Sequence, residues 1–194
     1  MADMQRVSVV GNAGAGKSRF AQRLAAQLGA PWVELDAIHH LADWEPIDPA
    51  TFHAAVDKIA STNTWVIDGN YRSVVVDGPV WRRADTVVWL DLPRRTVMRQ
   101  LTLRSLRRVV RHEQLWNGNQ ESVRTLLAWD PHLSLIRWAW TQHGKYRGRF
   151  ASAMASEELS HLQFVRVRSR REAEAFLARR SVQPRPPREV GDAR

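Results

Sequence analysis

The chain has 194 residues, no cysteine and a formal charge of +9. Its length fits one domain with a sizeable core, and the lack of cysteine excludes disulfides, thiol nucleophiles and cysteine-ligated zinc. No uncharged apolar run approaches the roughly 20 residues that span a bilayer, and the N-terminal segment lacks the apolar core of a signal peptide. We therefore expect a cytoplasmic protein without a membrane partner.

The first part of the chain predicts a strand, a turn, a helix and a second strand. Arg6–Val10 is a short β-branched run that predicts the first strand, and Gly11 opens a turn. From Lys17 onward the apolar residues follow helical spacing until Gly29, which supplies a C-terminal stop. Trp32–Leu35 predicts the second strand.

The middle of the chain predicts two helices and two strands. Asp48-Pro49 reads as an N-cap followed by proline at the first helical position. Thr64–Asp68 and Thr86–Asp91 are apolar runs that predict strands, each ending in aspartate. A long helix starts near Pro93 and loses its pattern at Trp116–Asn119, which predicts a loop.

The C-terminal part predicts a second cap-and-proline helix start at Asp130-Pro131, a fifth strand at Leu162–Val167 and a closing helix at Arg171–Arg180. Residues 181–194 are rich in proline and arginine, which predicts a disordered basic tail. Because strands alternate with helices, we expect an α/β fold whose parallel sheet is covered on both faces. Residues 1–180 would form this single domain.

The turn after the first strand carries a phosphate-binding motif of the form Gly-x4-Gly-Lys-Ser/Thr. Its backbone N–H groups and the following helix N-terminus favour bound phosphate. Lys17 would reach the β- and γ-phosphates of ATP, and the Ser18 hydroxyl would ligate Mg²⁺. The plain alternative is a glycine-rich turn without a ligand. The predicted nucleotide-binding residues of this loop are Gly11, Asn12, Ala13, Gly14, Ala15, Gly16, Lys17 and Ser18.

Three other segments accompany this loop: Leu35-Asp36, Trp65–Tyr71 and Val88–Pro93. With them, roughly residues 5–180 resemble the adenylate-kinase-related P-loop proteins grouped as DNA topology modulation proteins. The resemblance implies a three-layer α/β/α P-loop fold with a five-stranded parallel sheet in order 2-3-1-4-5. It also implies an acceptor-binding insert at about 37–62, an arginine-bearing helical lid at about 104–125, and transfer of the ATP γ-phosphate to a small acceptor.

The resemblance extends to one arginine of the acceptor side. This chain reads Gly69-Asn70-Tyr71-Arg72 where nucleotide kinases of the superfamily usually carry Gly-Phe-Pro-Arg. Arg72 keeps its position and is expected to bind the acceptor. The changed residues before it leave the kind of acceptor open.

Strand-end carboxylates are the candidates for metal and acceptor binding. Asp68 resembles the aspartate that holds the Mg²⁺ shell through water, and Asp91 matches the same pattern less well. Asp36 ends the second predicted strand, where ligands of open α/β sheets bind, so it could act as base or orienter toward an acceptor hydroxyl. Either aspartate could instead cap a helix or turn. His39-His40 lacks a third ligand, so we assign it no metal.

The long predicted helix carries arginines without any acid between Leu92 and His112. Helical spacing places four of them on one face and three apolar residues on the other, so we expect one face to pack and the other to clamp phosphate. An ordinary solvated face is the alternative. Of the four arginines, Arg104 and Arg108 are predicted to be catalytic, Arg107 is predicted to bind nucleotide, and Arg111 completes the face. The apolar residues are Leu103, Leu106 and Val110. Arg147 and Arg149, later in the chain, could add a second clamp.

Two functions follow from these patterns. The first is a Mg²⁺-dependent P-loop phosphotransferase acting on a small acceptor. The second is an NTP-binding regulator that uses the arginines and the basic tail on nucleic acid, because net positive charge attracts any polyanion. A GTPase is less favoured because no Asn-Lys-x-Asp segment is present. Trp65 and Trp89 lie within predicted strands and should be core residues. The acceptor, the preferred base and the oligomeric state are not determined by the sequence.

Overall fold

The computed structural model describes residues 4–122 and 134–181 of the chain. Its centre is one five-stranded sheet in the order β2-β3-β1-β4-β5, in which every paired strand is parallel. The predicted fold class and strand order are therefore confirmed. The strands are β1 (Arg6–Gly11), β2 (Trp32–Glu34), β3 (Trp65–Asp68), β4 (Thr86–Leu90) and β5 (Gln163–Val167).

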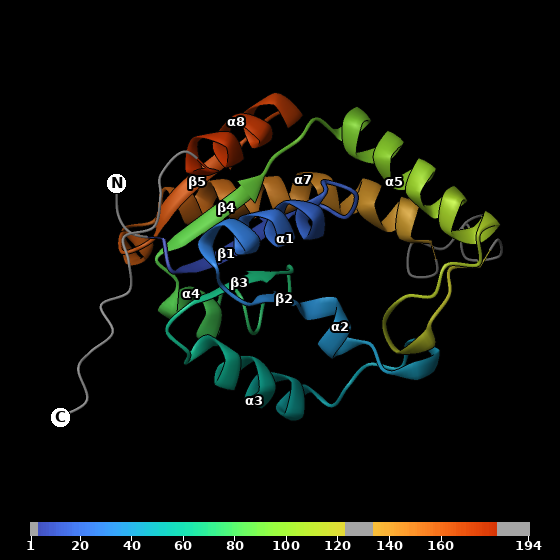
Figure 1. Ribbon diagram of the computed structural model, residues 1–194, viewed down its shortest axis with the longest axis horizontal. Helices are drawn as coiled ribbons and strands as arrows, with labels where there is room; N and C mark the ends of the chain where they lie inside the picture. Colours follow the sequence, from blue (N-terminus) through green and yellow to red (C-terminus); the bar gives the residue numbers. More distant parts are fainter. Residues whose placement is uncertain (1–3, 123–133, 182–194) are drawn as a thin grey trace.

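Helices cover both faces of this sheet, as the strand–helix alternation predicted (Figure 1). Helices α1 and α8 pack on one face, and α3, α4 and α7 pack on the other. The short helices α2 and α4 were not predicted. The helices are α1 (Lys17–Leu28), α2 (Leu35–His39), α3 (Pro49–Ala60), α4 (Pro79–Arg83), α5 (Arg94–Val110), α7 (Leu135–Met154) and α8 (Arg170–Ser181), with 3-10 turns η1 (Ala42–Trp44), η2 (Trp116–Gly118) and η3 (Glu157–Leu159).

Two predicted helix boundaries are explained by their end groups. The Asp48 carboxylate accepts a hydrogen bond of 2.8 Å from the Thr51 amide and caps α3, whose first residue is proline. Gly29 ends α1 in the left-handed conformation, at φ 60°. The predicted start at Asp130-Pro131 lies outside the described residues. So does the predicted basic tail, except for Ser181, the last residue of α8.

The core contains several tryptophans because a parallel sheet buries both of its faces. Trp65 and Trp89 are 0% and 2% exposed, which confirms their predicted place in the core. Trp81 is also fully buried, and its indole N–H donates to the Ser8 hydroxyl at 3.1 Å, so its polar atom is not left unpaired. Within the described residues, no helix has the length and apolar character needed to cross a membrane.

The expected packing of the long helix was wrong for its second half. The residues predicted to pack, Leu103, Leu106 and Val110, are 59%, 44% and 76% exposed. The buried residues of α5 are instead Val97, Leu101 and Ser105. The reason lies in the partners, because α5 packs through its first turns against α7 and the phosphate loop. Its second half continues beyond the sheet, where Figure 1 shows it at the rim of the molecule.

Candidate active site

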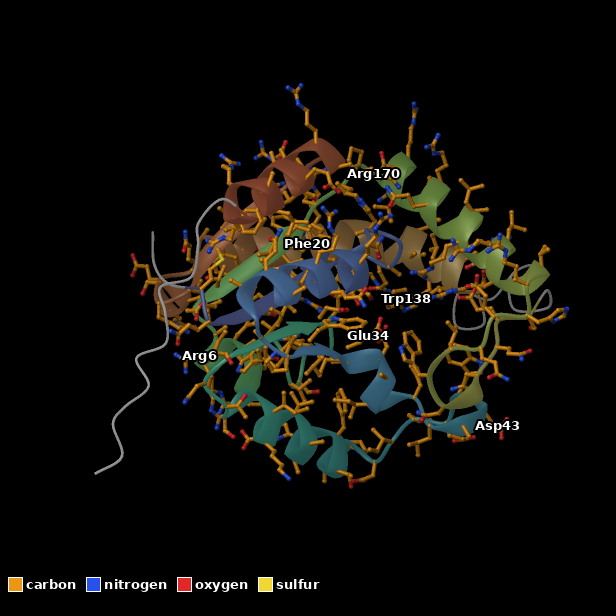
Figure 2. The ribbon with its side chains drawn as sticks, in the orientation of Figure 1. Arg6, Phe20, Glu34, Asp43, Trp138 and Arg170 are labelled. Atoms are coloured by element: carbon orange, nitrogen blue, oxygen red, sulfur yellow. The ribbon has the colours of Figure 1, made fainter. Side chains whose placement is uncertain are left out.

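A cleft of about 1460 Å³ lies at the carboxyl ends of the central strands. The phosphate loop, the ends of β2 and β3, helix α5 and helix α7 supply its walls, which is where open α/β sheets bind ligands. Figure 2 labels Glu34 and Trp138, two of its lining residues, near the middle of the view, and Asp43 at its edge. The predicted site residues that line the cleft are Ala13, Gly14, Gly16, Lys17, Ser18, Asp36, Arg72, Arg104, Arg107 and Arg108.

The phosphate loop has the backbone that its glycines predicted. Gly14 and Gly16 have φ of 84° and 90°, in the left-handed region where a side chain is strained. Lys17 Nζ donates to the carbonyl of Asn12 at 3.4 Å, so the lysine folds back over its own loop. The buried Asn12 amide donates to the Ala139 carbonyl at 2.8 Å and ties the loop to α7. The start of α1 therefore faces the cleft from a fixed loop.

The side chain of Asn70 fixes the entrance to this loop. Its amide nitrogen donates to the Gly11 carbonyl at 2.7 Å, and its amide oxygen accepts from the Gly11 N–H at 3.2 Å. The paired bonds join the second residue after β3 to the last residue of β1. The sequence placed Asn70 in a segment of the family resemblance but gave it no role.

Ser18 lies against two carboxylates, one of which the sequence analysis missed. Its hydroxyl donates to Glu34 Oε1 at 2.6 Å, and Asp68 Oδ1 is 3.5 Å from the same oxygen. A hydroxyl has one proton to donate, so the shorter contact to Glu34 is the stronger bond. Glu34 and Asp68 are direct partners in the register of β2 and β3, which brings their carboxylates together. In the sequence, the alternation of Glu34 and Asp36 at the end of a predicted strand was the feature that could have indicated a role for Glu34.

The predicted metal residue Asp68 is buried in a strongly charged environment. Burial is the main reason that its pKa rises to about 6, and the nearby charges of Glu34 and Asp36 raise it further. The Lys17 ammonium and the Trp32 indole, which donates to Asp68 Oδ2 at 3.0 Å, act in the opposite direction. The site thus concentrates negative charge beside the Ser18 hydroxyl, an arrangement that a cation would stabilise.

Asp36 lies in the first turn of α2 rather than at the end of a strand, because β2 stops at Glu34. Its carboxylate accepts a hydrogen bond of 2.7 Å from the Tyr71 hydroxyl. Burial and the Asp36 charge hold the pKa of Tyr71 above its ordinary value, so the tyrosine stays a donor. Burial lowers the pKa of the neighbouring His39. Among the described residues, no group of three or more His, Cys, Asp or Glu side chains forms a metal cluster.

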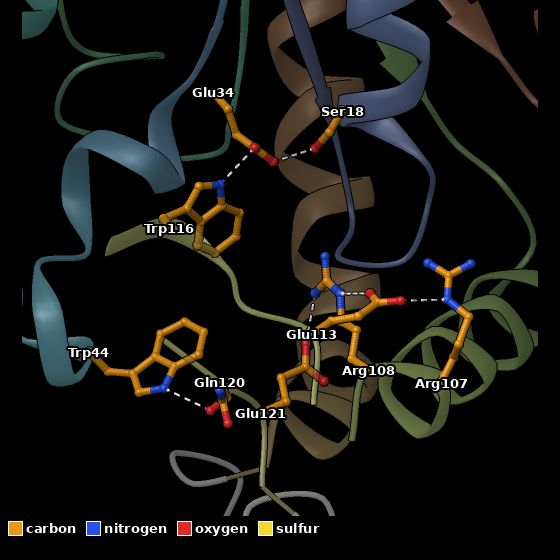
Figure 3. A network of polar contacts seen from close by, with 9 residues as sticks. All are labelled: Ser18, Glu34, Trp44, Arg107, Arg108, Glu113, Trp116, Gln120 and Glu121. Carbon is orange, nitrogen blue, oxygen red and sulfur yellow. Dashed lines mark hydrogen bonds and ion pairs between the residues drawn. The ribbon is translucent and has the colours of Figure 1, made fainter. Parts of the chain in front are cut away.

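Four arginines of α5 line the cleft, Arg99, Arg104, Arg107 and Arg108, and the last two pair with acids that follow the helix in sequence (Figure 3). Arg108 donates to Glu121 at 2.7 Å, and Arg107 donates to Glu113 at 3.1 Å. Arg104 has a buried Nε without a hydrogen-bond partner among the described residues. Burial, followed by the charge of Arg108, lowers the pKa of Arg104. Arg104 is therefore the arginine of this group with a buried N–H group that lacks a partner among the described residues.

The remaining candidates divide between the cleft and a separate ion-pair cluster. Arg72 lines the cleft and pairs with Asp77 at 2.7 Å. Arg149 also lines the cleft, with its guanidinium 5.5 Å from the ring centre of Tyr146. The alternative metal residue Asp91 instead binds two arginines, with Arg166 at 2.5 Å and Arg147 at 3.4 Å. These two arginines and Asp91 are absent from the cleft lining.

Together, the sheet order and the glycine-rich loop after β1 define the fold of a P-loop kinase. The solved structures agree with this class, at identities that establish the fold alone. A shikimate kinase from Bacteroides thetaiotaomicron aligns with a TM-score of 0.56 at 16% identity, covering 91% of this chain and 96% of that one. A shikimate kinase from Acinetobacter baumannii in complex with shikimate aligns with a TM-score of 0.55 at 15% identity, covering 91% and 90%.

A gluconokinase from Sinorhizobium meliloti 1021 aligns with a TM-score of 0.51 at 19% identity, covering 92% of this chain and 94% of that one. No protein-family model and no curated protein sequence matches the chain. The kinase fold is therefore established, while the narrower resemblance to the DNA topology modulation group stays a prediction.

The contact between Gly14 and helix α5 gives a testable consequence for stability. A Cβ atom at Gly14 would lie 2.7 Å from Leu101 Cβ and 2.9 Å from the Val97 carbonyl. We expect Gly14→Ala to lower the free energy of unfolding by roughly 2 kcal/mol or more, because strain at positive φ adds to the clash. Gly16→Ala is the matched control, since Gly16 has a similar φ but a Cβ atom there would meet no atom of another segment within 4 Å. Urea unfolding measures both, and equal losses would contradict the contact.

Proposed function

We propose that this protein is a cytoplasmic Mg²⁺-dependent phosphotransferase that moves the γ-phosphoryl group of ATP to a small-molecule acceptor. The observation that carries the proposal is convergence on one cleft: Lys17 and Ser18 of the phosphate loop, Asp36 after β2 and Arg104 of α5 all line it. The fold class agrees, since the solved neighbours are named as small-molecule kinases.

The residues around Ser18 fit a magnesium ion. Mg²⁺ in phosphate sites usually takes one or two protein ligands and completes its shell with phosphate oxygens and water. The Ser18 hydroxyl offers a ligand, and the carboxylates of Glu34 and Asp68 beside it offer oxygens for water in the shell. When bound, the ion would neutralise charge on the phosphates of the nucleotide.

The other residues would align the reactants and stabilise charge. Phosphoryl transfer needs mainly positioning and positive charge around the moving group. Lys17 would leave the Asn12 carbonyl for the β- and γ-phosphates, and the free donor of Arg104 would contact the γ-phosphoryl group. In the transfer, the bond between the γ-phosphorus and the β,γ-bridging oxygen breaks, and that oxygen leaves with ADP. The γ-phosphorus forms a new bond to the acceptor hydroxyl oxygen. The hydroxyl proton passes to Asp36.

The remaining assignments follow the walls of the cleft. The segment of about 37–62 would bind the acceptor together with Arg72, and the segment of about 104–125 would act as the lid. Arg107 and Arg108 would hold the nucleotide from that lid, where Glu113 and Glu121 already orient their guanidinium groups. Because these arginines line the cleft, a kinase lid accounts for them better than a surface for nucleic acid does.

A panel of acceptors tests the proposal. Purified protein would be assayed for ADP release with nucleosides, nucleotides, sugars and hydroxy acids, with shikimate and gluconate included because the solved neighbours are named for them. We expect at least one class to raise ADP release above the rate with ATP alone, and the increase to disappear when EDTA removes Mg²⁺. Stimulation by no acceptor, together with salt-dependent binding of DNA, would instead support the NTP-binding regulator.

A further inference from the structure

One side chain from beyond α5 reaches the carboxylate next to Ser18. Trp116, in the turn η2, donates its indole N–H to Glu34 Oε2 at 2.8 Å (Figure 3). The other oxygen of the same carboxylate accepts the Ser18 hydroxyl at 2.6 Å. A continuous chain of hydrogen bonds therefore runs from η2 through Glu34 to the phosphate loop. Neither Trp116 nor Glu34 had a predicted role.

The position of Trp116 is fixed by a contact between the turns η1 and η2, which we call the clasp. The side-chain amide nitrogen of Asn119 donates to the Leu41 carbonyl at 2.7 Å, and its side-chain oxygen accepts from the backbone N–H of Trp44 at 2.8 Å. Asn117 donates to the His40 carbonyl beside them. The clasp joins the two segments proposed as acceptor insert and lid, so Trp116 can reach Glu34 only while these segments are together.

The chemistry of the two donors matters for what Glu34 can do. An indole N–H only donates, so Trp116 can bind Glu34 only through an accepting oxygen, and this bond fixes the rotation of the carboxylate. With Oε2 held by the indole, Oε1 stays directed at Ser18, the residue proposed to ligate the metal. Groups that orient the residues around a metal in this way typically change metal affinity by about 10- to 100-fold when removed.

We propose that Trp116 is a positioning residue that orients Glu34 toward the Mg²⁺ shell and so couples closure of the clasp to binding of the metal–nucleotide complex. This inference rests on the proposed phosphotransferase function. The carboxylate would present the same oxygen to Ser18, or to a water of the metal shell, whenever the clasp is closed. With the clasp open, Glu34 would lose this donor and turn more freely.

A purely structural role for Trp116 makes a different prediction. Its ring stacks on His40, with ring centres 6.1 Å apart and planes at 20°, and meets Trp44 edge-on at 6.4 Å. Trp116→Phe keeps an aromatic ring for this packing and removes only the N–H donor. Trp44→Phe is the matched control, because it also removes an indole N–H from the clasp, the one 3.3 Å from the Gln120 carbonyl, without touching Glu34.

Calorimetry with the β,γ-imido analogue of ATP separates the two roles without any need for turnover. Binding would be measured for wild type and both variants, once with Mg²⁺ and once with EDTA. For Trp116→Phe we expect roughly 10-fold weaker binding with Mg²⁺ and unchanged binding with EDTA. Trp44→Phe should change neither by more than about twofold. In a Glu34→Ala background, which lacks the acceptor, Trp116→Phe should lose most of its effect, since the two residues act through one bond.

Four results would overturn the inference. Equal weakening of Trp116→Phe with and without Mg²⁺ would assign Trp116 to packing alone, as would an effect that persists in the Glu34→Ala background. Unchanged binding of folded Trp116→Phe under both conditions would remove its role altogether. A wild-type protein that binds no nucleotide under either condition would overturn the proposed function, and this inference with it.

Discussion

Lys17→Ala should lower ATP turnover by roughly 10²- to 10³-fold while the protein stays folded. The physical reason is the loss of a preorganised positive charge at the phosphates, where Lys17 now donates to the Asn12 carbonyl at 3.4 Å. The loop itself should survive, because Asn12, Asn70 and the backbone hold it without the lysine. ADP release measures the effect, with the acceptor found by the panel or with ATP alone.

Lys145→Ala is the control for this experiment. Lys145 is an exposed lysine of α7 that does not line the cleft, so its loss changes the net charge equally without touching the phosphates. We expect its turnover to match wild type within about twofold, since exposed surface substitutions seldom disturb the fold. If the two variants had the same turnover, the phosphate loop would not be the catalytic site.

Asp68→Asn should stabilise the protein in the absence of nucleotide and metal. In the folded protein the pKa of Asp68 is about 6 against an ordinary value of 3.8. The folded state therefore holds this proton more tightly than the unfolded state. The ionised Asp68 carboxylate therefore destabilises the folded state. This effect is absent below pH 3.8, grows as the pH rises to about 6, and is complete above that. A shift of this size corresponds to at most about 3 kcal/mol.

Urea unfolding at several pH values tests this expectation. Asn keeps an oxygen for the Trp32 indole, so the variant should gain about 1 to 3 kcal/mol at pH 8 and progressively less as the pH falls below 6. Asp91→Asn is the contrasting control, because Asp91 is also buried but is bound by Arg166 and Arg147, and its loss should destabilise the protein. Destabilisation by Asp68→Asn at pH 8 would contradict the charge environment described for the site.

The sequence predicted the parts of this protein that are local in the chain. The strand order followed from the resemblance, and the phosphate loop from a motif whose glycines are needed for its backbone. Asp48 and Gly29 marked helix ends because capping depends on a few adjacent residues. The three-layer arrangement followed from strands alternating with helices, since parallel strands need helical crossovers.

The missed residues depend on contacts between distant segments. Glu34 lies beside Asp68 because of the register of β2 against β3, and Trp116 meets Glu34 across a contact between distant loops. The acids that pair with the α5 arginines, Glu113 and Glu121, lie beyond the helix, after the acid-free stretch from Leu92 to His112. Periodicity identified the apolar stripe of Leu103 and Val110 but could not show that α5 extends past its packing partners.

The clasp also bears on how the protein exchanges its ligands. Segments centred near residues 42 and 118 are tied by hydrogen bonds to backbone and side chain, each worth on the order of 1 kcal/mol. If the proposed function is right, reactants that enter between these segments, and products that leave, must wait for several such bonds to break together. Gate opening of this kind is often slower than bond-making in enzymes with lids. Under the proposed function, we therefore expect the release of product, rather than phosphoryl transfer, to limit the catalytic cycle.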